Sequence, residues 1–593
     1  MITHRITLED THAHLFRVTL SIPQPATQQR LSMAVWIPGS YLLREFARHV
    51  SGMTAHQGKR SVALHQLDKA TWLADCAGKA PLVVTYLVYA LDTSVRAAFL
   101  NAQRGFFNGT GVFLRAEGFE NQPQQVALPL LPKGWKAATA MPAVKVNKAG
   151  CGIYQAENFD ALVDHPFELG DFWRGHFTAL GVSHEFVVAG ALPDFDGERL
   201  LADTRRICEA EIKFWHGKAL GKNQPAHRRY VFMLNAVEDG YGGLEHRDST
   251  ALIAARRDLP QVGQAQGAPL SDGYVTLLGL ISHEYFHTWN VKRLKPDEFA
   301  PFDYTQENYT ELLWFFEGFT SYYDDLLLLR AGLIDQARYF GLLGKAISGV
   351  LATPGRKTQS VAQSSFDAWV KYYRADENTP NATVSYYTKG SLVALALDLT
   401  LRSSTSGSLD AVMRLLWQRS GGGVGKGAIT EADILSAIQH VAGRSLAAEF
   451  QAWVHGTDDL PLRALLKTVG VDFISQAATM AQRLGLRVSE SALTGARITH
   501  VLRGGVGEQA GLSAGDELLA LDGWRLRRLD DARRLEHPGK KYSFMVARDQ
   551  RVLELQATWP KADVAATLGS VNLAAHAQPE PLALALRKAW LAG

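Results

Sequence analysis

The stretch TLLGLISHEYFHTW, residues 276–289, decides how this chain is interpreted. It is apolar enough to form a buried helix, which we expect over 273–289. His283 and His287 are four residues apart, so they share one face of that helix and can hold one zinc ion together. Glu284 lies beside that face, where it can take a proton from a water at the metal.

The same pattern has an ordinary alternative. Short H-E-x-x-H matches arise by chance in long chains, and buried histidines commonly make ordinary hydrogen bonds. A zinc site also needs a third protein ligand and an open coordination position.

Glu317 is the third ligand that we predict. It lies in LWFFEGFTS (313–321), and a carboxylate in so apolar a helix is costly to bury unless a cation compensates it. The rival acids are Asp303, Glu307 and Glu311. Asn308 followed by Glu311 matches a capping box, which gives Glu311 a structural role. We expect one Zn²⁺, since two histidines and a carboxylate suit zinc, although cobalt and manganese stay open.

The pattern of apolar runs predicts several domains. Residues 1–168 read as a β-rich domain, with short runs at 15–22, 31–37 and 81–91. In 169–470 we expect strands at 185–193 and 228–237 and a helix at 200–220. The rest of this region is expected to be mainly helical. These helices are expected at 273–289, 309–330, 333–351, 388–402, 430–442 and 444–455. Residues 478–560 contain short β-like runs separated by Gly-rich turns. The tail 561–593 includes a possible helix at 581–591.

Length and composition exclude several classes of protein. A chain of 593 residues is too long for one hydrophobic core. Its net charge of +3 argues against a nucleic-acid binder. Cys76, Cys151 and Cys208 are far apart, so neither a disulfide framework nor a cysteine-based zinc site is expected. No apolar run is long enough to span a membrane and no signal peptide pattern is seen, so we expect a cytoplasmic protein.

Several motifs together resemble a known family. H-E-x-x-H followed by W-x-x-E-G-F-T resembles the gluzincin metallopeptidases, and the chain is similar to the glycyl aminopeptidase family with a C-terminal PDZ domain. The segments that carry the resemblance are WIPGSYLLREFARHV (36–50), YGGLEHRDS (241–249), HEYFHTWNVKRLKP (283–296), LLWFFEGFTSYYDDLLLLRAG (312–332) and YYTKGSLVALALDL (386–399). The resemblance implies a multi-domain α/β protein, with a β-rich N-terminal domain, a thermolysin-like α/β catalytic domain with a helical portion, and a PDZ-like domain. It also implies removal of N-terminal residues, with Gly and Ala preferred.

The resemblance implies further roles for individual residues. Glu245, which follows Gly242 and Gly243, would pair with the free α-amine of a peptide substrate. Here Leu and His replace the Met and Asn of the related G-x-M-E-N element, and a plain turn acid is the alternative. Tyr387 would donate a hydrogen bond to the oxyanion. The adjacent Tyr386 competes for that role, and either could be a core aromatic.

Two more features come from the resemblance. The segment RGGVGEQAGLSAGD (503–516) resembles a PDZ domain of the bacterial protease type, which binds extended peptides or C-termini. A role in packing or assembly is the alternative. Arg44 stands out only through the family pattern, and a salt bridge between domains is its ordinary interpretation.

The sequence therefore predicts a zinc-dependent aminopeptidase acting on peptides with a free N-terminus. Two alternatives stay open. One is an endopeptidase on the same zinc site, and the other is a non-catalytic scaffold that binds peptides through the PDZ-like domain. Glu245 discriminates between an aminopeptidase and an endopeptidase, because a carboxylate at this position favours substrates with a charged N-terminus.

Overall fold

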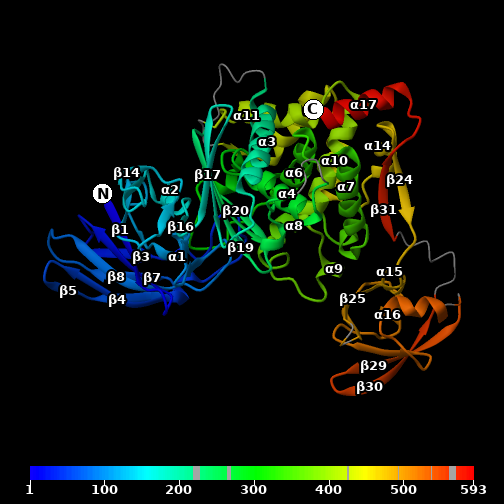
Figure 1. Cartoon of the computed structure of the whole chain (residues 1–593), viewed down its shortest axis with the longest axis horizontal. Helices are drawn as coiled ribbons and strands as arrows, with labels where there is room; N and C mark the ends of the chain where they lie inside the picture. The colour runs from blue at the N-terminus through cyan, green and yellow to red at the C-terminus, as the bar shows by residue number, and fades with distance from the viewer. Residues whose placement is uncertain are drawn as a thin grey trace. The chain divides into compact units, whose positions relative to one another are not determined.

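The computed structural model describes residues 1–217, 227–263, 269–423, 427–491, 493, 495–535, 537, 539–559 and 569–593. The described residues divide into two compact units. Figure 1 shows the helices and strands of the chain, coloured from blue at the N-terminus to red at the C-terminus. The first comprises Met1–Tyr309, Ala331–Leu333 and Leu416–Thr430, and the second Thr310–Arg330, Ile334–Leu415 and Glu431–Gly593. The predicted division between 560 and 561 falls outside the described residues. The predicted boundary at residue 168 falls within strand β16 (Phe167–Gly170).

The first unit begins with antiparallel β-sheets. One sheet has the order β14-β15-β12-β1-β2-β8-β4-β5, and others have the orders β13-β16-β10-β9 and β11-β3-β7-β6. The strands are β1 (Ile2–Asp10), β2 (Leu15–Ile22), β3 (Gln28–Ser32), β4 (Val50–Gln57), β5 (Arg60–Val62), β6 (Leu64–Asp68), β7 (Thr71–Asp75), β8 (Leu82–Tyr89), β9 (Ala98–Leu100), β10 (Arg104–Phe107), β11 (Arg115–Ala116), β12 (Gln124–Leu128), β13 (Lys136–Ala138), β14 (Ala143–Val146), β15 (Gly152–Ala156) and β16. β1 pairs β12 in parallel, as the exception. Along β2 buried residues alternate with half-buried ones, as one-sided packing requires.

A mixed sheet follows in the same unit, with the order β17-β18-β19-β21-β20. Its strands are β17 (Trp173–Ala179), β18 (Val182–Ala189), β19 (Arg229–Val237), β20 (Tyr241–Glu245) and β21 (Ser249–Ala255). The central strands β18, β19 and β21 run parallel and are buried along most of their length, as strands covered on both faces are. Helices α3 (Gly197–His216) and α4 (Asp272–Phe286) contact each other, and α4 also contacts β20 and β21.

The second unit begins with packed helices. They are α5 (Leu313–Phe316), α6 (Gly318–Arg330), α7 (Gln336–Leu351), α8 (Val361–Phe366), α9 (Thr379–Ala382), α10 (Tyr386–Ser404), α11 (Leu409–Arg419, which ends in the first unit), α12 (Glu431–Ala442), α13 (Ala447–Phe450) and α14 (Leu462–Thr468). α10 packs against α5, α6 and α7. The predicted helices at 333–351, 388–402 and 430–442 are confirmed, within a few residues at their ends.

Two helix predictions are wrong in detail. The helix expected at 309–330 begins only at Leu313, and the side chain of Asn308 hydrogen-bonds the backbone of Asp303 and Gln306 instead of forming a capping box with Glu311. The helix expected at 444–455 consists of α13 and the π-helical turn η7 (Gln451–His455).

A separate β-rich region completes the second unit. Its sheet has the order β25-β26-β27-β29-β30, with β28 paired to β27. The elements are β25 (Leu486–Ser491), β26 (Gly495–Val501), β27 (Glu517–Leu521), β28 (Trp524–Arg525), β29 (Lys541–Arg548), β30 (Arg551–Thr558), α15 (Met480–Leu484) and α16 (Val506–Gln509). Its buried apolar residues form one cluster, which includes Tyr542, Phe544 and Trp559. The prediction of a multi-domain α/β protein is confirmed.

The chain enters and leaves this region through paired strands. β24 (Val471–Gln476) precedes it, β31 (Ser570–Ala575) follows it, and the two pair in antiparallel fashion. The last helix, α17 (Pro581–Ala592), then packs on α6, α10 and α14. Trp590 of α17 is fully buried, and its indole Nε1–H donates to the Tyr322 hydroxyl at 2.8 Å.

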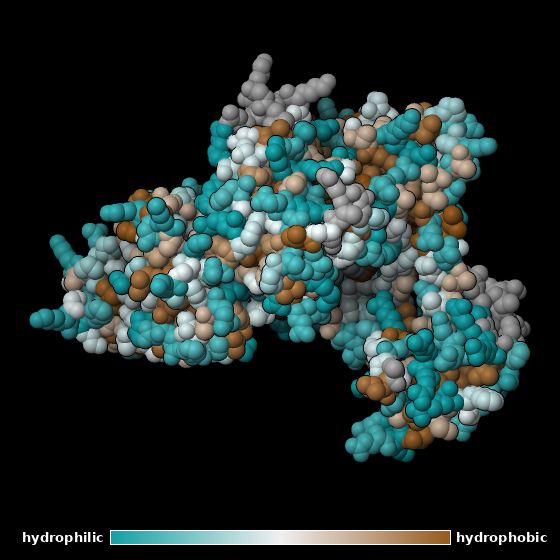
Figure 2. Space-filling model, in the orientation of Figure 1, coloured by the Kyte–Doolittle hydropathy of each residue, from teal (hydrophilic) through white to brown (hydrophobic). Residues whose placement is uncertain are grey.

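The face of the molecule seen in Figure 2 is mainly polar. Figure 2 shows hydrophilic residues over most of the visible face, with hydrophobic residues scattered among them. Among the described helices, none is both long and apolar enough to cross a membrane.

A buried ionic cluster joins α6, α10 and α11. Asp398 of α10 is inaccessible to solvent, and it accepts hydrogen bonds from the Tyr322 hydroxyl at 2.7 Å and from Arg402 Nε at 2.8 Å. Its Oδ1 also accepts the backbone N–H of Leu409 at 2.8 Å. The charge of Asp398 is therefore compensated inside the helical layer.

We predict that Asp398→Ala lowers the free energy of unfolding by about 3–5 kcal/mol, because it leaves the Arg402 charge buried with less compensation. Urea unfolding followed by tryptophan fluorescence measures the change. Lys345→Ala, on the exposed face of α7, is the matched control and is expected to stay within about 0.5 kcal/mol of the unchanged chain. Equal stability of the two variants would contradict the assigned role of Asp398.

Candidate active site

His283 lies in the last turn of helix α4, and His287 is the C-cap residue that directly follows the helix. Its first turn is capped by Ser271, whose hydroxyl accepts the N–H of Tyr274 at 3.1 Å. The rings of His283 and His287 have centroids 4.7 Å apart and are nearly perpendicular. Nδ1 of His287 lies 2.8 Å from the carbonyl oxygen of Asn290, so Nδ1 carries the proton and Nε2 is left as the ligand atom.

Glu317 lies where α5 passes into α6, and its side chain is 2% exposed. The backbone stays helical through this residue, since Glu317 N–H donates to Leu313 and Ser321 N–H donates to Glu317. The next residue, Gly318, packs closely on α10: a Cβ there would lie 2.6 Å from the Cα of Gly390. The absence of a side chain at Gly318 thus lets α6 and α10 come together beside the carboxylate.

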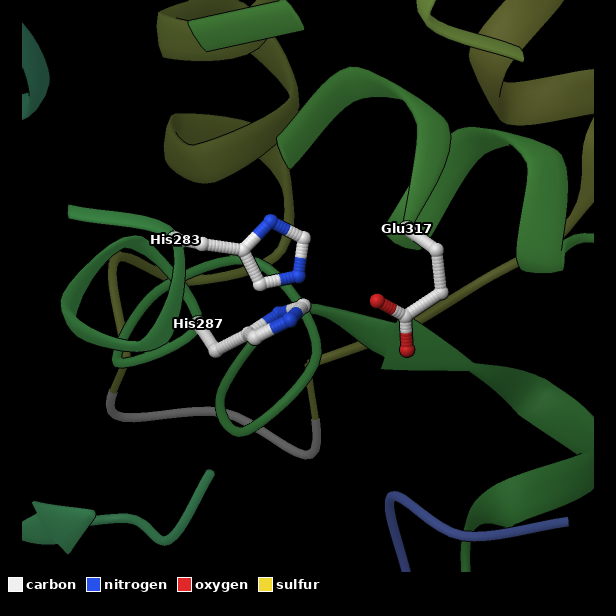
Figure 3. A group of neighbouring side chains, drawn as sticks. All are labelled: His283, His287 and Glu317. Atoms are coloured by element: carbon white, nitrogen blue, oxygen red, sulfur yellow. The ribbon is translucent and has the colours of Figure 1, made fainter. Parts of the chain in front are cut away.

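His283, His287 and Glu317 form a group of possible metal ligands. One ligand atom from each lies within 4.8 Å of the others. Figure 3 shows both imidazole rings and the carboxylate pointing toward one common space. Two imidazoles and one carboxylate are the donor set of many catalytic zinc sites, and a dication would compensate the buried charge of Glu317.

Two further carboxylates lie beside His287. Ligand atoms of Glu245, Glu284 and His287 also lie within 4.8 Å of one another. Glu284 is 5% exposed and Glu245 is 4% exposed. Glu284 lies directly over Gly243 of β20, because a Cβ at Gly243 would be 2.0 Å from its Oε1. The predicted residues Glu245, Gly242 and Gly243 therefore share one strand next to the catalytic glutamate that we predict.

The rival acids have other surroundings. Asp303 accepts hydrogen bonds from the backbone and the hydroxyl of Thr305, at 2.9 and 2.7 Å. Glu311 belongs to a different group of possible ligands, together with Glu431 and His455. These placements favour Glu317 over Asp303 and Glu311.

The two candidate tyrosines differ in exposure. Tyr386 is fully buried, whereas Tyr387 is half-buried in the first turn of α10, and their rings stack at 4.7 Å. The Tyr387 hydroxyl lies 3.4 Å from that of Tyr373. Burial raises the pKa of Tyr387 well above its usual range, and the negative charge of Glu317 raises it further. The Tyr387 phenol therefore stays protonated, and it lies near the carboxylate of Glu317.

A buried ionic cluster that sequence reasoning missed lies next to Glu245. Asp164 Oδ1 lies 3.1 Å from His246 Nδ1 and 2.8 Å from Lys292 Nζ. Burial opposes ionisation of Asp164, but the ammonium of Lys292 and the bond to His246 outweigh it and hold the pKa of Asp164 well below its usual range. No sequence motif could have signalled this cluster, because its members come from distant parts of the chain.

Arg44 makes a local contact: its Nη2 donates to the Ser40 hydroxyl at 2.7 Å. Both residues belong to the segment 36–50 that the sequence singled out. This hydrogen bond ties Arg44 to its own segment.

Three models of known protein families match three different segments of the chain. The family model for the M61 glycyl aminopeptidase matches residues 276–393, the one for the peptidase M61 N-terminal domain matches 3–171, and the one for the PDZ domain matches 475–536. A search of curated proteins gave no significant match.

Solved structures are also similar. An aminopeptidase N family protein from Idiomarina loihiensis is 36% identical with a TM-score of 0.90, and the match covers 100% of both chains. An M1 zinc metallopeptidase from Deinococcus radiodurans is 15% identical with a TM-score of 0.44, covering 78% of this chain and 94% of that one. Aminopeptidase A from Legionella pneumophila is 12% identical with a TM-score of 0.47, covering 95% of this chain and 57% of that one. The last two are too distant to bear on function.

The similarity to the Idiomarina loihiensis protein extends over the whole chain, and the family matches fall on the β-rich start, on the segment with both histidines and Glu317, and on the C-terminal β-rich region. The chain therefore belongs to the M61 glycyl aminopeptidase family, carries a PDZ domain, and is an aminopeptidase.

Proposed function

We propose that this chain is a zinc-dependent aminopeptidase that hydrolyses the first peptide bond of peptides with a free N-terminus, with small first residues such as Gly and Ala preferred. The observation that carries the proposal is the pair of neighbouring groups around His287. One group offers two imidazoles and a carboxylate to a metal, and the other adds two buried carboxylates beside it. The preference for a small first residue is supported by the family's description as glycyl aminopeptidases.

His283, His287 and Glu317 would hold one zinc ion. When bound, zinc would act as a Lewis acid towards the scissile carbonyl and the attacking water. The proton on Nδ1 of His287 is fixed by the Asn290 carbonyl, which leaves Nε2 for the metal.

The remaining steps fall to side chains of the protein. Glu284 would accept the proton of the attacking water and pass it to the leaving amine. Tyr387 would donate a hydrogen bond to the oxyanion, and its raised pKa keeps the phenol protonated. Glu245 would bind the α-ammonium of the substrate by a charge-assisted hydrogen bond. The first peptide bond would then lie at the metal, since Glu245 and Glu284 are neighbours.

The PDZ domain is the part that would bind an extended peptide or a peptide C-terminus. Among the described strands, β25 lies at the edge of its sheet with β26 as its partner. An edge strand has backbone groups to which a peptide can add as a further strand. This supports peptide binding by the PDZ domain in addition to the substrate site.

We predict that the protein releases the first residue from Gly- and Ala-starting peptides, and that the matched N-acetylated peptides are not cut. Blocking the amine removes the charge that Glu245 would bind. Amino-acid release is measured with and without a chelator, and activity lost with the chelator should return with zinc. Cleavage of blocked peptides would favour an endopeptidase, and zinc binding without any cleavage would favour a peptide-binding scaffold.

We predict that Glu284→Gln lowers kcat by at least about 100-fold, in line with the loss of general acid–base catalysis, while one zinc ion per chain is still bound. Glu317→Gln is expected to lower the zinc content itself, because it removes a ligand charge. Elemental analysis of the dialysed proteins separates the two effects. Glu307→Gln, at a rival acid, is the control, and a loss of zinc there would contradict the assigned ligand set.

A further inference from the structure

A tight turn of the N-terminal β-rich domain has a backbone conformation that only glycine adopts easily. Ile37 and Ser40 form an isolated β-bridge, and the Ser40 N–H donates to the Ile37 carbonyl at 3.0 Å. Gly39, between them, has a φ of +91°. A residue with a side chain is strained at this φ. This turn lies in the segment 36–50, and none of the catalytic residues proposed above belongs to that segment.

Gly39 lies directly against the Glu245 carboxylate. A Cβ built on Gly39 would lie 2.5 Å from both Oε1 and Oε2 of Glu245. A carbon and an oxygen cannot approach so closely, so any side chain at position 39 must displace the carboxylate or the turn. Since Glu245 is also buried, the turn forms one wall of the space around this carboxylate.

A second residue of the same domain contacts the neighbouring part of β20. The Nη2 of Arg96 donates to the carbonyl oxygen of Gly243 at 3.2 Å. Its Nη1 would lie 3.7 Å from a Cβ built on Gly242. Among the described strands β20 is at the edge of its sheet, so this carbonyl is one that a bound peptide could use. Arg96 occupies it instead.

The order of the two carboxylates along β20 determines how a peptide substrate would lie. Glu284 lies over Gly243, and Glu245 follows two residues later on the same face of the strand. A peptide whose ammonium meets Glu245 would therefore present its first bond towards Glu284. Any residue preceding that ammonium would have to extend past Glu245, where the Gly39 turn lies.

We propose that the N-terminal β-rich domain makes this site specific for free N-termini. Gly39 acts as a positioning residue that fixes the Glu245 carboxylate and closes the space beyond it. Arg96 limits the pairing of a peptide with β20 at Gly243. The inference rests on the proposed function in one respect, the binding of the substrate ammonium by Glu245.

Gly39→Ala and Gly58→Ala test the role of Gly39. Both positions have positive φ, +91° and +58°, so both substitutions strain a turn, but a Cβ at Gly58 would have no described atom within 4 Å. We expect Gly39→Ala to raise KM for a free Gly- or Ala-starting peptide by at least about tenfold, the loss of one charge-assisted hydrogen bond. kcat should change less, because the ammonium contact is made both in the enzyme–substrate complex and in the transition state. Gly58→Ala should leave both values unchanged.

The ratio of kcat/KM for free and N-acetylated peptides gives a second measure, together with zinc content. Gly39→Ala should lower that ratio by at least about tenfold at full zinc content, in proportion to the lost contact. Equal KM and equal ratios for the two glycine variants would overturn the proposal. Failure of the unchanged protein to distinguish free from acetylated peptides would instead overturn the proposed function.

Arg96 provides an independent variant if Gly39→Ala does not fold. Arg96→Ala should also lower the ratio for free over acetylated peptides, and Arg96→Lys should restore part of it by keeping a cationic donor. Arg5→Ala, at an exposed position of β1, is the control. When Gly39→Ala does not fold, an unchanged ratio in Arg96→Ala overturns the proposal.

Discussion

The burial of three carboxylates around one helix end is the constraint on which the candidate site depends. Glu245, Glu284 and Glu317 are each at most 5% exposed. Like charges gathered away from water raise the free energy of the folded state unless cations or hydrogen-bond donors compensate them. A zinc ion beside Glu317 and a substrate ammonium beside Glu245 are the cations that the proposed function supplies. The cost of burial is thus offset where binding takes place.

Glycines bring these carboxylates to their positions. Gly243 leaves room for Glu284, Gly39 leaves room for Glu245, and Gly318 lets α6 approach α10 next to Glu317. At each position a Cβ would lie less than 3 Å from a neighbouring atom. The site is therefore defined as much by absent side chains as by the acids and histidines themselves.

Much of this could be predicted from the sequence, because local patterns carry it. The spacing of His283 and His287 on a helix and the apolar surroundings of Glu317 are properties of short segments, and α4 has the expected extent within three residues. The start of α5 was predicted wrongly, since the Asn308 side chain bonds the loop before the helix. The contacts of Gly39 and Arg96 with β20 were not foreseen. They join positions far apart in the chain, and no periodicity or spacing encodes such contacts.

The pairing of β24 with β31 has a consequence for synthesis of the chain. The PDZ domain is inserted between these strands, and α17 packs on α6 and α10 only after both have been made. Since domains generally fold as they emerge from the ribosome, the helical layer next to Glu317 and Tyr387 stays incomplete until α17 has been translated. Trp590, three residues from the C-terminus, then inserts beside Tyr322. A chain truncated within the PDZ domain would contain every catalytic residue proposed here but would lack the helix that packs on α6 and α10.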